Sequence, residues 1–148
     1  MAGDVVALIG ELTDRQPVVG CRAMEELVRL SALSSEVYAF WDELLALAEH
    51  RSSFVRTRAL TLLAANVRWD EAHRLDAALP QLLAHIIDPK PITARQWIQR
   101  LPELAQARPD LAPRLLAALN AVDFSAYADS MRPLLERDAA AAKAQFAR

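Results

Sequence analysis

Residues 53–64 read Ser-Phe-Val-Arg-Thr-Arg-Ala-Leu-Thr-Leu-Leu-Ala, and they show the organisation of the chain more clearly than any other stretch. Apolar residues recur there at Val55, Ala59 and Leu62, which is the spacing of one face of an α-helix. Two serines stand at the start, where short polar residues favour the beginning of a helix. The pattern therefore predicts an amphipathic helix over residues 53–67.

This helix carries Arg58, one of four arginines that recur at nearly regular intervals. Arg22, Arg58, Arg95 and Arg132 are separated by 36, 37 and 37 residues. An apolar residue stands two places after each of them: Met24, Leu60, Trp97 and Leu134. Four periods of this length account for all 148 residues. A fixed period in this range is typical of solenoids, because one helix pair cannot bury its apolar face without neighbours.

Helical patterns cover nearly all of the remaining chain. Of the 148 residues, 29 are alanine and 23 are leucine, both strong helix formers, and only three are glycine. The spacing of apolar residues predicts eight helices, at residues 5–12, 19–30, 36–50, 53–67, 70–88, 92–107, 109–122 and from the segment after Ser125 to the alanines at 139–142. Pro80 and Pro102 fall inside two of them, where we expect kinks because the apolar pattern continues beyond each proline.

We therefore predict an all-α protein built as a single repeat domain over residues 1–148. Because the connections between the helices are short, neighbouring helices are expected to be antiparallel. The helices group into about four pairs, at residues 1–33, 34–69, 70–108 and 109–148.

The letters of residues 53–64 resemble the second helix of a HEAT repeat, where a Val-Arg-x-x-Ala-x-x-x-Leu pattern recurs. Pro17-Val18-Val19 and Pro91-Ile92 are similar to the turn that precedes that helix. The chain as a whole resembles the HEAT and armadillo repeat families, including small bacterial HEAT-like proteins, some of them with an iron–sulfur assembly label. Its fourth window departs from the pattern at Asp129 and Pro133. The resemblance implies a right-handed α–α superhelix whose second helices line a concave face.

The resemblance also implies roles for particular polar residues. In HEAT proteins an arginine at this place pairs with an aspartate of the neighbouring repeat, and Asp14, Asp88 and Asp123 precede three of the arginine windows. The alternative is that the arginines contact an acidic ligand. Asn66 lies on the apolar face of its helix and resembles the armadillo asparagine that grips an extended peptide. Its alternative role is to tie down an adjacent turn, since a buried amide needs partners.

The composition speaks against several classes of site. The net charge of −2 and a pI near 5.9 give no general attraction to phosphate backbones. The single cysteine, Cys21, is too few for an iron–sulfur cluster, and the three histidines lack metal-ligand spacing. There is no glycine-rich phosphate loop. We expect no catalytic residues, no metal, no cofactor and no enzyme activity, and the lack of a leader or membrane-length apolar run suggests a cytoplasmic protein without a membrane span.

These observations favour a non-enzymatic interaction module or scaffold that binds a protein or peptide of unknown identity on its concave face. The contacts would be guanidinium forks, amide hydrogen bonds and an aromatic side chain. The predicted binding residues are Arg56, Arg58, Asn66, Trp69, Asp70, Lys90, Arg95 and Gln96. Two alternatives stay open: a nucleic-acid-binding or DNA-repair-type HEAT-like protein, and a structural module that dimerises through the repeat end at residues 5–12, which carries few charges.

Overall fold

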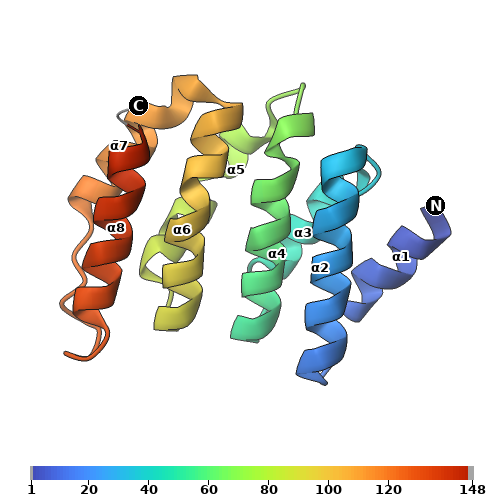
Figure 1. Cartoon of the computed structure of the whole chain (residues 1–148), viewed down its shortest axis with the longest axis horizontal. Helices are drawn as coiled ribbons and strands as arrows, with labels where there is room; N and C mark the ends of the chain where they lie inside the picture. The colour runs from blue at the N-terminus through green and yellow to red at the C-terminus, as the bar shows by residue number, and fades with distance from the viewer. Residues whose placement is uncertain (1, 147–148) are drawn as a thin grey trace. The chain divides into compact units, whose positions relative to one another are not determined.

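The computed structural model describes residues 2–146, and this part of the chain is mainly helical (Figure 1). This part contains no strand. Its eight α-helices are α1 (Ala2–Glu11), α2 (Pro17–Leu33), α3 (Trp41–Leu47), α4 (Ser53–Asn66), α5 (Arg74–Leu83), α6 (Pro91–Ala107), α7 (Ala112–Ala121) and α8 (Arg132–Phe146). Four short 3-10 helices adjoin them: η1 (Tyr38–Phe40), η2 (Val67–Trp69), η3 (Ala84–Ile87) and η4 (Pro109–Leu111). The predicted all-α class and the number of helices are confirmed.

Four of the predicted helices are shorter than expected. The third and the seventh begin with the 3-10 turns η1 and η4 before α3 and α7, and the fifth is α5 followed by η3. The last begins only at Arg132, where the next residue is a proline that suits the first turn of a helix. The preceding segment, residues 122–131, is not helical because its side chains are used elsewhere: Phe124 is buried, and the Tyr127 hydroxyl donates to the Asp88 carbonyl.

The two interior prolines do not end their helices. α5 runs through Pro80 and α6 runs through Pro102. Each proline removes one backbone N–H from the helix, so the remaining packing must hold the turn together. The expected continuity of both helices is confirmed, and the kink expected at each proline stays a prediction.

The chain forms two compact units, Met1–Leu75 (unit 1) and Asp76–Arg148 (unit 2). In unit 1, α2 packs against α1 and α4, and α4 also packs against α3. Its largest fully buried side chains are Leu12, Leu27, Trp41, Leu44, Leu60, Leu62, Leu63 and Leu75. In unit 2, α6 packs against α8, α7, η3 and η4. The corresponding side chains there are Leu79, Leu82, Trp97 and Ile98.

Each unit holds a contact of the kind that the repeat period predicts. The second helices of neighbouring pairs lie side by side, α2 with α4 in unit 1 and α6 with α8 in unit 2 (Figure 1). Such contacts bury the face that a single helix pair would leave open. The continuation of the pairs as one right-handed superhelix and one domain stays a prediction.

The four regularly spaced arginines do not occupy equivalent places. Arg22 is exposed, whereas Arg58 is only 6% exposed. Arg95 is half-buried and pairs with Asp138, its Nε lying 2.7 Å from the carboxylate. Arg132 is the first residue of α8 and pairs with an aspartate three residues earlier. The sequence period therefore corresponds to the spacing of the second helices along the chain. The four arginines, however, do not make equivalent contacts.

The three aspartates expected to pair with the repeated arginines form local turns, while one arginine–aspartate pair does join neighbouring second helices, Arg95 with Asp138. Asp14, Asp88 and Asp123 each accept a backbone N–H from the residue two places later, at 2.8 to 2.9 Å. This is the local turn that aspartate side chains readily form. For Asp123, the hydrogen bonds from Ser125 lower the pKa of the carboxyl below its usual value. The carboxylates shape the connections between helices instead of joining neighbouring repeats.

Two tryptophans instead connect helix ends. Trp97 Nε1 donates to the Leu82 carbonyl in unit 2, and Trp69 Nε1 donates to the Ser31 carbonyl in unit 1, both at 2.8 Å. Both carbonyls lie in the last turn of a helix, where backbone acceptors have no partner within the helix. The indole of Trp97 is 1% exposed, whereas that of Trp69 is half-buried.

We predict that Trp97→Phe lowers the free energy of unfolding by about 2–4 kcal/mol, because a buried carbonyl loses its donor and a small cavity opens. Trp69→Phe should cost less, roughly 1 kcal/mol, since the half-buried Trp69 side chain leaves a smaller buried cavity. Urea denaturation followed by circular dichroism measures both values. Equal losses in the two variants would contradict the difference in burial.

Candidate functional site

The predicted binding residues are divided between the two units. Arg56, Arg58, Asn66, Trp69 and Asp70 belong to unit 1, and Lys90, Arg95 and Gln96 belong to unit 2. Their surroundings differ widely, from fully buried to exposed. The exposed and half-buried members have most of the surface that a partner can reach.

Arg58 is a buried residue and not an open surface contact. Its Nη1 donates to the Leu12 carbonyl at 2.8 Å, just beyond the end of α1. The guanidinium lies so close to Gly20 of α2 that a Cβ there would be 2.2 Å from its Cζ. Arg58 therefore does not lie on an open surface, because packing holds its side chain among α1, α2 and α4, and its role as a binding residue stays a prediction.

Asn66 is also buried, with 0% of its surface exposed. Its Nδ2 donates to Ser31 Oγ at 3.0 Å and to the Leu62 carbonyl at 2.8 Å. Ser31 Oγ in turn donates to the carbonyl of Leu27 at 2.7 Å. The armadillo-like role for Asn66 is wrong, since the amide joins α4 to α2 inside unit 1 and cannot reach an external peptide.

Arg56 and Trp69 are half-buried and use their polar groups inside unit 1. The Arg56 Nη1 donates to the carbonyls of His50 and Arg51 at 3.0 and 3.1 Å. The Trp69 indole N–H is bound to Ser31, as described above. Part of each side chain remains at the surface. The Arg56 Nη1 and the Trp69 indole N–H, however, donate to carbonyl groups of unit 1.

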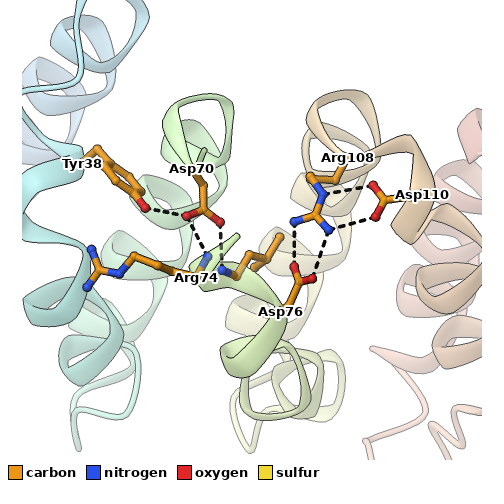
Figure 2. Close-up of polar contacts among 7 residues, drawn as sticks. Tyr38, Asp70, Arg74, Asp76, Arg108 and Asp110 are labelled. Carbon is orange, nitrogen blue, oxygen red and sulfur yellow. Dashed lines mark hydrogen bonds and ion pairs between the residues drawn. The ribbon is translucent and has the colours of Figure 1, made fainter. Parts of the chain in front are cut away.

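Asp70 is 4% exposed and holds the start of α5 (Figure 2). Its two carboxylate oxygens accept the backbone N–H groups of Arg74 and Leu75 at 2.9 and 2.8 Å. These N–H groups lack partners within the helix, so the carboxylate acts as a cap. The Tyr38 hydroxyl donates to the same carboxylate at 2.5 Å, while the Arg74 guanidinium lies over the tyrosine ring and pairs with Asp42. The predicted binding role for Asp70 is wrong, because its oxygens face these internal donors.

The three predicted residues of unit 2 behave differently. Lys90 and Gln96 are exposed. Arg95 is held by Asp138 of α8, with its Nε and Nη2 both directed at the carboxylate. These three residues do not form a pocket among the described residues. Their role as surface contacts for a partner stays a prediction.

The sequence interpretation missed Arg108, the most strongly paired arginine of unit 2 (Figure 2). It is buried between two carboxylates, those of Asp76 and Asp110, at 2.7 and 2.9 Å. The hydrogen bonds that Arg108 donates to Asp110 and to Asp76 raise the pKa of the guanidinium above its usual value. The nearby sequence Arg-Pro-Asp at residues 108–110 was the available signal, but Asp76 is 32 residues away.

A small cavity of about 240 Å³ lies in unit 1, where the connection before α2 meets the connection before α4. The charged, aromatic and titratable residues in its lining are Asp14, Arg15, His50, Arg51, Phe54 and Arg58. Ligand pockets for drug-sized molecules usually measure about 300–1,000 Å³, so this cavity suits a single chemical group. Arg15 and Arg51 are exposed, and each stands two residues before the first residue of a second helix. This repeated position, with a spacing of 36 residues, is the signal that could have identified them.

The cavity is electropositive. Three arginines and one aspartate line it. Both adjoining helices, α2 and α4, begin without an acidic residue in the first turn and, within the described part, without a side-chain cap. Backbone N–H groups in the first turn of a helix carry partial positive charge, although the first residue of α2, Pro17, has no N–H. His50 Nδ1 accepts the Ser52 N–H at 2.9 Å, which leaves the proton of the neutral ring on Nε2. The arrangement can hold an anion.

Comparisons with known proteins give no match: no family model, curated protein or solved structure is similar to this chain. Among the described residues, no group of three or more histidine, cysteine or acidic side chains is placed to hold a metal ion. None of the described helices is long and apolar enough to span a membrane. The evidence for the candidate site therefore comes from the geometry and charge of its residues.

We predict that Gly20→Ala destabilises unit 1 by about 1–2 kcal/mol, although alanine favours helices by up to about 1 kcal/mol. The new Cβ displaces the Arg58 guanidinium and breaks its bond to Leu12. Gly10→Ala is the matched control, because its Cβ would meet nothing within 4 Å, and it should be neutral or stabilising. Urea denaturation measures both, and a stabilised Gly20→Ala variant would contradict the packing.

A second prediction concerns Tyr38, whose pKa is raised by burial and by its hydrogen bond to Asp70. Because the pKa is higher in the folded state, this contribution to stability is complete below the unfolded value of about 10 and disappears as the pH rises through the folded value. Tyr38→Phe should therefore reduce the alkaline loss of stability. Tyr127, whose pKa burial raises to about 12, should retain its own share in that variant. The test compares the urea midpoints of the wild-type chain, Tyr38→Phe and Tyr127→Phe from about pH 8 to about pH 12, a range that brackets the unfolded pKa of about 10. A loss of stability at alkaline pH that is the same in both variants as in the wild-type chain would contradict the prediction.

Proposed function

We propose that the chain is a non-enzymatic binding module, and that unit 1 contacts an acidic segment of a protein partner around its cavity. The observation that carries the proposal is the grouping of Arg15, Arg51 and Phe54 at one opening. Phe54 is 64% exposed, which is unusual for a large aromatic side chain. Arginine and aromatic side chains are enriched where proteins meet.

The proposal retains the interaction module inferred from the sequence and changes the surface. The residues first expected to form a concave site are mainly internal, whereas the arginines before α2 and α4 are exposed. Two exposed guanidinium groups can form forked hydrogen bonds with carboxylates of a partner. The kinship with HEAT repeats and the cytoplasmic location remain part of the proposal; a free, exposed cysteine, Cys21, suits a reducing compartment.

We expect the wild-type chain to bind peptides rich in aspartate and glutamate, and the double variant Arg15→Glu with Arg51→Glu to bind them at least about tenfold more weakly. Arg22→Glu with Arg68→Glu is the matched control: it makes the same charge change at two exposed arginines outside the cavity lining. Fluorescence anisotropy with labelled peptides measures the affinities. An equal loss in the control would show that net charge alone matters and would contradict the site.

The aromatic contribution has its own pair of variants. Phe54→Ala should weaken peptide binding, whereas Leu33→Ala, which removes an equally exposed apolar side chain at the end of α2, should not. Two other outcomes favour different functions. Strong retention on a heparin column, lost in the double variant, would indicate a nucleic-acid ligand. A dimer in light scattering that Phe54→Ala dissociates would indicate that a second copy covers this surface.

A further inference from the structure

Arg58 presents a physical problem that the packing of unit 1 only partly solves. A guanidinium has five N–H donors, and among the described residues Arg58 uses one nitrogen, Nη1, in a hydrogen bond to the Leu12 carbonyl. No carboxylate of the described chain forms an ion pair with it, although it is 6% exposed. Burying a charge in this way is costly unless a counter-charge accompanies it.

The nearby negative groups supply little compensation. The end of α1 contributes the partial charge of its carbonyls through Leu12. Asp14 lines the same cavity, but its Oδ1 is occupied by the N–H of Gln16 at 2.8 Å, and its side chain is exposed. Arg15 and Arg51 add two further positive charges to the lining. The cavity therefore has an excess of positive charge, with a buried guanidinium in its wall.

We propose that this cavity is a binding site for a phosphoryl group, with Arg58 as its innermost donor and Arg15 and Arg51 at its rim. The inference rests on the proposed function, because it names the anionic group that this site of unit 1 would accept from a partner. A dianion matches the excess charge better than a single carboxylate does. Guanidinium forks bind phosphate oxygens with two parallel hydrogen bonds, and the partial positive charge at the starts of α2 and α4 adds to the charge of the arginines.

The size of the cavity agrees with this ligand class. At about 240 Å³ it is smaller than pockets that enclose whole nucleotides or drug-sized molecules. A phosphoryl group on a side chain of a partner, or free inorganic phosphate, would present the same oxygens to the arginines. The rest of a phosphorylated segment would then lie outside, where Phe54 is exposed.

The test is a titration of ¹⁵N-labelled full-length chain with inorganic phosphate, at constant ionic strength and with chloride as reference. We expect saturable shifts in the amides of residues 13–20 and 50–58. Arg15→Ala with Arg51→Ala should weaken binding about tenfold or more, and Arg22→Ala with Arg68→Ala should leave it within about twofold. Arg58→Lys keeps the charge but loses the fork, so it should also weaken binding; if it does not fold, the rim variant still decides the matter.

A phosphoserine peptide and its unphosphorylated form then identify the source of the group. Tighter binding of the phosphorylated form assigns the site to a partner side chain, whereas binding of inorganic phosphate alone assigns it to the free ion. Shifts that are not saturable, that chloride reproduces, or that the rim variant leaves unchanged would overturn the inference. Binding of unphosphorylated acidic peptides with no response to phosphate would support the proposed function while overturning this inference, so the two can fail separately.

Discussion

A helix leaves backbone N–H groups without partners at its start and carbonyl groups without partners at its end. A chain of short helices has many such ends, and burying them requires side chains that can reach across. In this protein those side chains hold the packing together. Arg58 donates to the carbonyl beyond α1, Trp69 donates to the last turn of α2, and Trp97 donates to the last turn of α5. Asp70 accepts from the first turn of α5.

This constraint explains why polar residues that suggested a binding face from the sequence lie inside the units. Asn66 falls on the apolar face of α4 because that face packs against α2, and its amide finds Ser31 there. Asp70 lies between η2 and α5, and its carboxylate accepts hydrogen bonds from N–H groups in the first turn of α5. In both cases the protein's own backbone or core takes up hydrogen bonds of the side chain, although the buried Oδ1 of Asn66 accepts none from the described residues.

Arg58 differs from these residues. The surrounding helices leave room for its guanidinium, but no carboxylate of the described chain balances its charge. Gly20 makes room for the guanidinium, and Leu12 accepts one of its hydrogen bonds. By contrast, Arg108 is buried between Asp76 and Asp110. Arg108 therefore has two carboxylates beside it, whereas Arg58 has none among the described residues. This difference is why we infer an anion site in the cavity beside Arg58. The exposed arginines at the same opening then connect this internal feature with a surface that a partner can reach.

The spacing of apolar residues in the sequence was sufficient to establish the all-α class and eight helices, because helix periodicity is a local property. The continuation of α5 and α6 through Pro80 and Pro102 followed from the same pattern. The sequence could not show that Arg22, Arg58, Arg95 and Arg132 have four different environments, since burial depends on tertiary packing and the partners of Arg58 and Arg95 lie far away in the sequence. Arg58 meets Leu12, 46 residues earlier, and Arg108 meets Asp76, 32 residues earlier. Which arginine is paired, and which is left to face a cavity, is decided only when distant helix ends pack together.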